Sequence, residues 1–182
     1  MARDNQRQKV YDWERKYLED LPGNKSLSLE ECQQLINRSC QRYSKVVPEL
    51  KDGRGTRFAR GSSRVINLPG WARKTWVVLH EIAHSIQMGK RDLFTPFEYQ
   101  YHGPEFMRLF LDLLVWQKLE KLPELRRSAK KSGIKVATAI GAPRPSGWQN
   151  KLKDDIDRIV EKYQKNYNLS GSRVKTKIKN IV

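Results

Sequence analysis

The sequence predicts an α+β fold in which a small antiparallel sheet packs against a buried helix. Two observations support this prediction. Segments without proline or glycine repeat apolar side chains at helical spacing, whereas residues 46–68 consist of short extended runs interrupted by glycine. The chain has 182 residues, of which 38% are hydrophobic, and this composition suits one packed domain with a polar appendage.

Two amphipathic helices are predicted at the start of the chain. The first covers residues 3–20, where apolar side chains share one helical face: Val10, Trp13, Tyr17 and Leu18. The second begins after Ser28, because Glu31 completes a capping box with it. Cys32 and Cys40 lie on its apolar stripe, about 12 Å apart along the helix, which is beyond the reach of a disulfide. We therefore expect two buried, reduced cysteines.

Two further helices are predicted after the extended region. Residues 71–88 contain no proline or glycine, and their many apolar side chains favour a helix buried in the core. Another helix is expected over residues 104–120, since Pro104 suits a first helical turn. The elements alternate helix, sheet and helix, as expected for the α+β class.

The basic residues gather in the last third of the chain. The formal net charge is +16, and residues 121–182 hold 16 of the 36 lysines and arginines but only 5 of the 20 acidic residues. After Pro123 the sequence is also rich in proline and glycine. We therefore predict a domain over residues 1–122, followed over residues 123–182 by a basic linker and a C-terminal helix that begins near Ser146.

This charge distribution favours contact with a polyanion such as nucleic acid, although solubility alone is a competing explanation. The candidate nucleic-acid contacts are Arg126, Arg127, Lys130, Lys131 and Lys135. The sequence contains no run of about 18 apolar residues and no apolar N-terminal stretch, so we expect a cytoplasmic protein that does not span a membrane.

His80, Glu81 and His84 form an H-E-x-x-H motif inside the helix predicted over residues 71–88. Residues four apart in a helix lie about 40° from each other around the axis, so both imidazoles can bind one metal ion. Neutral imidazole is a preferred ligand of zinc. The motif therefore predicts a site for one zinc ion.

A catalytic zinc site needs a third protein ligand and one open position. The one remaining histidine of the chain, His102, lies directly before the helix predicted from Pro104, where it can project toward a neighbouring helix. Glu98 or Glu105 is an alternative third ligand, which would give a site with two histidines and one carboxylate. We expect His102, because its imidazole matches the other two ligands.

Glu81 neighbours a metal ligand in sequence and is predicted to act as a general base. Zinc lowers the pKa of a bound water to about 7, Glu81 accepts its proton, and the polarised carbonyl of a peptide is attacked. Tyr99 or Tyr101, close to His102, could stabilise the developing negative charge on that carbonyl oxygen. Packing within the loop is the competing explanation for both tyrosines.

The motifs resemble two groups of known proteins. HEIAH followed by HGPEF resembles the SprT-like zinc metalloproteases, which pair H-E-x-x-H with a downstream His-Gly. Over residues 1–120 the chain is similar to a family of small metallohydrolases with the stretches RDxQRxxVYxWE, INLPxWAR, VVLHELAH and HGPEF, with Ile82 where leucine is usual. This resemblance implies that His80, His84 and His102 bind zinc and that Glu81 is the catalytic acid and base. It assigns no substrate.

We therefore expect a zincin-like α+β fold and a zinc metallopeptidase that cleaves a peptide or protein substrate. The substrate would lie extended along an edge strand near residues 64–68. One alternative is an SprT-like protease that associates with nucleic acid through its basic C-terminal segment. Another is a non-catalytic structural or interaction protein whose zinc only stabilises the fold, but a stabilising site has no need of Glu81.

Overall fold

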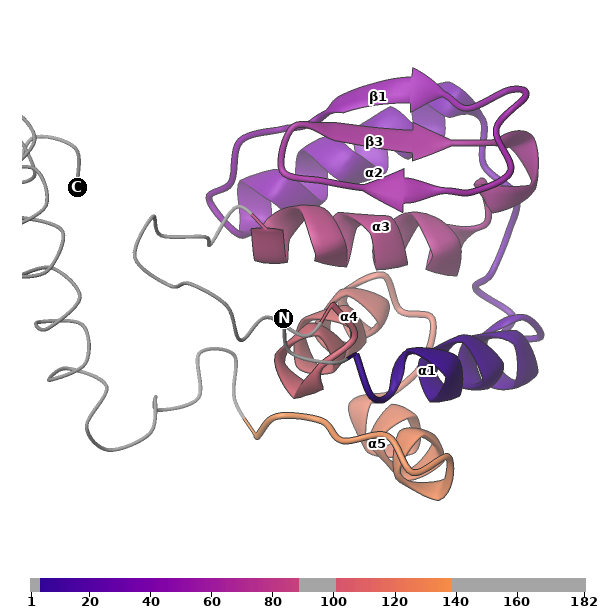
Figure 1. Ribbon diagram of the computed structural model, residues 1–182, viewed down its shortest axis with the longest axis vertical. Helices are drawn as coiled ribbons and strands as arrows, with labels where there is room; N and C mark the ends of the chain where they lie inside the picture. The colour runs from indigo at the N-terminus through magenta and orange to yellow at the C-terminus, as the bar shows by residue number, and fades with distance from the viewer. Residues whose placement is uncertain (1–3, 89–100, 139–182) are drawn as a thin grey trace, which may run out of the picture. The chain divides into compact units, whose positions relative to one another are not determined.

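A computed structural model describes residues 4–88 and 101–138 of the chain, and all of them belong to one compact unit. In chain order the elements are α1 (Arg7–Trp13), the π-helical turn η1 (Glu14–Leu18), α2 (Leu29–Arg42), β1 (Glu49–Asp52), β2 (Arg60–Gly61), β3 (Val65–Leu68), the 3-10 turn η2 (Gly70–Ala72), α3 (Thr75–Met88), α4 (Pro104–Trp116) and α5 (Leu122–Lys131). Helix α3 lies between the sheet and α4 (Figure 1). The predicted α+β class is confirmed.

The sheet has three strands in the order β1-β3-β2. Strand β3 pairs in parallel with β1 and antiparallel with β2, so the prediction of an antiparallel sheet is wrong for one of the two pairs. A tight turn joins β2 to β3, where the Ser62 N–H donates to the Val65 carbonyl oxygen at 2.9 Å. Turn-forming residues in the sequence can indicate such a hairpin, but they do not indicate that β3 pairs with β1.

Strand β3 is the central strand, so the prediction that residues 64–68 offer an edge to a substrate is also wrong. Within the part of the chain that the structure describes, β1 and β2 are the edge strands of the sheet. One face of β3 is buried through Ile66 and Leu68, whereas Val65 and Asn67 are partly exposed. Strand β2 contacts helix α3, and this places one free edge beside the H-E-x-x-H motif.

The first two helices agree with their sequence patterns. The predicted helix over residues 3–20 is observed as α1 and η1, which bury Val10, Trp13 and Leu18. At the start of α2 the capping box is confirmed, because the Glu31 N–H donates to Ser28 Oγ at 3.1 Å and the Ser28 N–H donates to Glu31 Oε2 at 2.7 Å. Both cysteines are free and buried, as predicted.

Helix α3 is buried along almost its whole length. Every residue from Thr75 to Gln87 is buried, including the polar side chains of His80, Glu81 and His84. It begins at Thr75 rather than at residue 71, because η2 forms a separate turn after Pro69. No helix within residues 4–88 or 101–138 is long and apolar enough to cross a membrane.

Helix α4 begins at Pro104 as predicted but ends at Trp116, before residue 120. Lys118 has a φ of 57°, and the Leu119 N–H donates to the Leu114 carbonyl oxygen at 3.0 Å. This left-handed residue followed by a hydrogen bond across the last turn is a Schellman motif, which terminates helices.

The linker predicted after Pro123 is instead helix α5, so the predicted boundary at residue 122 falls within its first turn. Leu125 and Ala129 of α5 are fully buried, and Ile134 beyond it is nearly so. The Ala137 N–H donates to the Pro104 carbonyl oxygen at 2.9 Å, which ties this region to the start of α4. The C-terminal helix predicted near Ser146 lies outside the described residues.

Candidate metal centre

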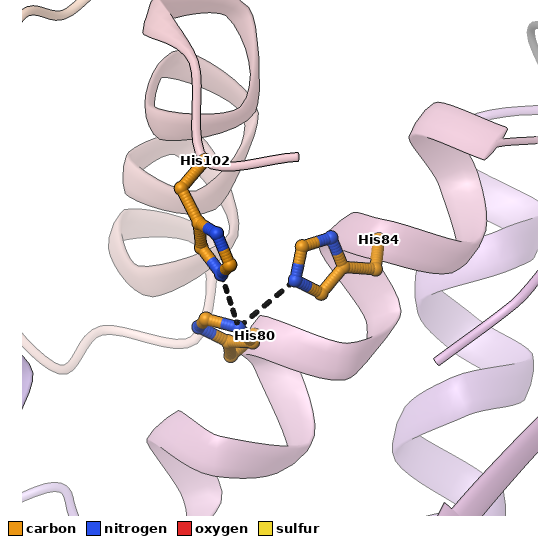
Figure 2. A group of neighbouring side chains, drawn as sticks. All are labelled: His80, His84 and His102. Atoms are coloured by element: carbon orange, nitrogen blue, oxygen red, sulfur yellow. Dashed lines mark hydrogen bonds between the residues drawn. The ribbon is translucent and has the colours of Figure 1, made fainter. Parts of the chain in front are cut away.

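The three histidines converge in the core of the described unit (Figure 2). Helix α3 places His80 and His84 on one face, and His102 faces them from the residue before the N-cap of α4. Nε2 of His80 lies 3.0 Å from Nε2 of His84 and 3.4 Å from Nε2 of His102. All three side chains are buried.

This spacing fits a metal ion. A tetrahedral zinc with Zn–N bonds of about 2.0–2.1 Å separates its nitrogen ligands by about 3.4 Å. The ligand atoms of His80, His84 and His102 all lie within 4.8 Å of one another, so small side-chain movements suffice. The predicted convergence of the three histidines is confirmed. Glu105 is exposed on α4, and Glu98 lies outside the described residues.

The environments of the three imidazoles differ. Burial and the neighbouring His80 and His102 hold the pKa of His84 well below its usual value. Burial also lowers the pKa of His102 to about 4, although the hydrogen bond with Asp4 opposes this. For His80, burial lowers the pKa, but the carboxylates of Glu14 and Glu81 together outweigh burial, so the pKa is raised. His84 and His102 are therefore neutral at pH 7, as metal ligation requires.

Two carboxylates hold the outer nitrogens of this cluster. Nδ1 of His80 donates to Glu14 Oε1 at 2.5 Å, and Nδ1 of His102 donates to Asp4 Oδ2 at 2.7 Å. Nε2 of each ring is thereby left without its proton when the imidazole is neutral. Nδ1 of His84 is buried and has no hydrogen-bond partner among residues 4–88 and 101–138.

Neither carboxylate was predicted from the sequence. Glu14 is only 2% exposed although it is acidic, and it lies at helical spacing from Val10 and Leu18 on the buried face of the first helix. An acidic residue in an apolar stripe was therefore the available signal. Asp4 precedes the apolar pattern of the first helix, and its one signal in the sequence is its place, like that of Glu14, in the stretch RDxQRxxVYxWE that carries the family resemblance.

Glu81 lies beside the cluster and is held by the sheet. Its carboxylate accepts a hydrogen bond from the Gly61 N–H, and burial raises its pKa despite the opposing effects of His80 and this hydrogen bond. Gly61 lies opposite Ile66, one residue before the hydrogen-bonded Ser62–Val65 pair. In an antiparallel pair this alternation turns the Gly61 N–H away from β3, and therefore toward α3.

Gly61 has no room for a side chain. A Cβ atom at this position would lie 2.1 Å from the Glu81 carbonyl oxygen, far inside van der Waals contact. Glycine therefore allows β2 to approach the backbone of α3 at the H-E-x-x-H motif. This close approach brings the free edge of the sheet next to the Glu81 carboxylate.

Tyr101, one of the two tyrosines suggested by the sequence, lies beside His84, and Tyr11 is a further tyrosine near the cluster. Tyr101 is 44% exposed, with its ring centroid 6.2 Å from that of His84, and Tyr99 lies outside the described residues. Tyr11 of α1, which was not predicted from the sequence, has its ring centroid 5.0 Å from that of His102. Burial first, and then the Glu14 and Glu81 carboxylates, raise its pKa to about 12, so its hydroxyl keeps its proton at pH 7.

Four of the five basic residues suggested for nucleic-acid contact lie on helix α5, whereas the Lys135 backbone hydrogen-bonds Gln6, which also donates to the His102 carbonyl oxygen. All five are exposed, on helix α5 or just after it: Arg126, Arg127, Lys130, Lys131 and Lys135. Arg127 pairs with Glu124 at 2.6 Å. Arg127 and Lys131 also line a groove that includes Lys16 and Tyr17 of η1.

Comparison of the chain with protein-family models, curated proteins and solved structures finds no match. The resemblance to zincins and SprT-like proteases therefore rests on the sequence motifs. The structure supports a coarser statement, which is an α+β fold that buries three histidines close enough to bind one metal ion.

Proposed function

We propose that this protein is a zinc-dependent metallopeptidase with a zincin-like site. The observation that carries the proposal is the combination of three converging imidazoles with a buried glutamate, Glu81, next to one of them. Three nitrogen ligands leave one position open on a tetrahedral zinc, as catalytic sites require. A site that only stabilises the fold has four protein ligands as a rule.

Zinc is the expected metal because the donor set is made of imidazoles, which it binds well when they are neutral. When bound there, it would acidify a water molecule and polarise the carbonyl of a substrate. His80, His84 and His102 would hold the ion through Nε2, since Nδ1 of two of them is already engaged. The ligand atoms require no further residue to complete the set.

Glu81 would accept the proton of the attacking water and later deliver it to the leaving amine. Burial raises the pKa of Glu81 toward neutral pH. A carboxyl group whose pKa lies nearer the working pH both accepts and donates a proton efficiently. The hydrogen bond from Gly61 would fix the carboxylate without neutralising it. Tyr11, or the more exposed Tyr101, would donate a hydrogen bond to the carbonyl oxygen as negative charge develops.

An extended peptide would lie along β2 rather than along residues 64–68. Strand β2 is an edge strand among the described residues and contacts α3, so a substrate strand lying alongside it would pass beside Glu81, whose carboxylate keeps the Gly61 N–H. Main-chain pairing of this kind supplies affinity with little dependence on side chains. This placement favours unfolded segments of protein as substrates.

The proposal is tested with Glu81→Gln, which keeps the shape of the side chain but removes the base. Cleavage of unfolded protein, followed by mass spectrometry, should fall by about 100-fold or more, whereas bound zinc stays at the wild-type level. The double substitution His80→Ala, His84→Ala serves as the control that loses zinc. Cleavage by Glu81→Gln at the wild-type rate would refute the assigned mechanism.

A second candidate, a protease associated with nucleic acid, draws on the outward-facing basic residues of α5. Arg126 and Lys130 are exposed and have no ion-pair partner among the described residues. Nucleic acid would then bring the site close to bound protein substrates. The third candidate, a non-catalytic protein with a stabilising zinc, requires that wild-type protein bind zinc and cleave nothing.

A further inference from the structure

Asp4 and Glu14 touch the histidine cluster from outside. They lie on an N-terminal segment, residues 4–18, and are 98 and 66 positions from the histidines that they contact. Each accepts a hydrogen bond from one imidazole Nδ1, which directs Nε2 of that imidazole into the cluster. The N-terminal segment therefore reaches two of the three candidate ligands.

The segment is anchored firmly enough to orient these rings. Gln6 Nε2 donates to the His102 carbonyl oxygen at 2.7 Å and to the Lys135 carbonyl oxygen at 3.1 Å. Gln6 Oε1 accepts from the Lys135 N–H at 3.0 Å. Tyr11 packs its ring edge against His102. Asp4 and Glu14 are thus held in place by contacts other than their own ion pairs.

The charge of a metal ion gives these carboxylates a second role. A divalent ion with three neutral imidazoles would carry two positive charges into a region lined by Phe106 and Phe110, whose ring centroids lie 5.0 and 5.5 Å from that of His80. Buried charge is costly unless it is compensated. The side chains of Glu14 and Asp4 are 2% and 20% exposed, so they would compensate it with little screening by water.

We infer that Glu14 and Asp4 are positioning residues of the metal centre, which orient His80 and His102 through Nδ1 and balance the charge of the bound ion. The competing explanation is that both are ion pairs that serve only the stability of the fold. The inference rests on the metal site of the proposed function but not on hydrolysis. Carboxylates in this position commonly strengthen metal binding by neighbouring histidines.

The test measures zinc affinity of the full chain by competition with a chromophoric chelator. Glu14→Gln and Asp4→Asn keep the size of the side chain and an acceptor oxygen but remove the charge. Asp12→Asn is the matched control, since Asp12 lies on the same N-terminal segment and faces solvent, with Arg15 and Gln8 as partners. Thermal melting of the metal-free proteins reports whether each variant folds.

Glu14→Gln should weaken zinc binding by about 10- to 100-fold, Asp4→Asn by about tenfold because it is more exposed, and Asp12→Asn by less than about twofold. The visible absorption of the cobalt-substituted protein should also shift in Glu14→Gln and Asp4→Asn. A purely structural role would lower the melting temperature without changing the geometry at the metal.

The inference would be overturned if Glu14→Gln and Asp4→Asn both fold and bind zinc with the affinity of the wild type. If Glu14→Gln does not fold, the affinity and cobalt spectrum of Asp4→Asn decide, because Asp4 lies at the edge of the cluster. Wild-type protein that binds zinc with the expected ranking of variants but cleaves no substrate would refute the peptidase and leave the inference standing. Wild-type protein that binds no zinc would overturn both.

Discussion

The N-terminal segment, residues 4–18, and helix α5 are both amphipathic and contact each other, but only the N-terminal segment buries a charged side chain. The N-terminal segment turns Glu14 inward, where the carboxylate is 2% exposed and contacts His80. Helix α5 buries Leu125 and Ala129 and leaves its charged side chains outside.

A buried charged side chain is a stronger indication of function than an exposed one. Burying a carboxylate is costly, so its presence inside the core requires a partner and points to a role there. Exposed lysines and arginines cost little, and they are compatible with nucleic-acid binding, with solubility or with both. The buried Glu14 carboxylate therefore supports a role at the metal centre. The exposed basic residues of α5 support nucleic-acid binding only if the affinity for nucleic acid depends on them.

The largest expected effect contrasts inward and outward side chains at the start of α4. His102→Ala should weaken zinc binding by more than the roughly 100-fold that removal of an outer partner costs, because it removes a ligand. Glu105→Gln, on an exposed residue of the same turn, should leave the affinity unchanged. Isothermal titration with zinc measures both. If Glu105→Gln weakened zinc binding more than His102→Ala, the third ligand would be the Glu105 carboxylate.

An intermediate effect is expected where β2 meets α3. Gly61→Ala should destabilise the fold by about 3 kcal/mol, because the new methyl group collides with the Glu81 backbone and forces the strand away. Gly70→Ala is the control, since nothing lies within 4 Å of the added atom. Urea unfolding gives both free energies. Equal stabilities of the two variants would show that β2 does not approach α3 this closely.

The smallest effect concerns the outward face of α5. If it binds duplex DNA, the double variant Arg126→Gln, Lys130→Gln should reduce the slope of log affinity against log salt concentration by about 0.9 for each phosphate that is no longer neutralised. Lys25→Gln, Lys51→Gln removes the same charge from other parts of the surface. Fluorescence anisotropy at several salt concentrations measures the slopes. Identical slopes for the two double variants would remove α5 from any DNA interface.

The wrong predictions from the sequence share a physical cause. Helix α5 was interpreted as a linker because its narrow apolar stripe, Leu125 and Ala129, is outnumbered by charged residues, and its burial depends on contacts with distant elements. Strand β3 was interpreted as an edge because the hairpin with β2 is a local signal, whereas its pairing with β1 is not. Glu14 is acidic, so the apolar periodicity of the first helix does not reveal it, and its contact with His80 exists only in the tertiary structure.

The sequence by itself determined what depends on neighbours along the chain. The capping box of α2, the buried helix α3 and the placement of His80 and His84 on one face all follow from spacings of three or four residues. Tertiary structure decided the order of the strands, the approach of His102, and the contacts of Asp4, Glu14 and Gly61 with the site. These contacts join residues far apart in sequence, and they form only when the apolar faces of α1, α3, α4 and the sheet pack together.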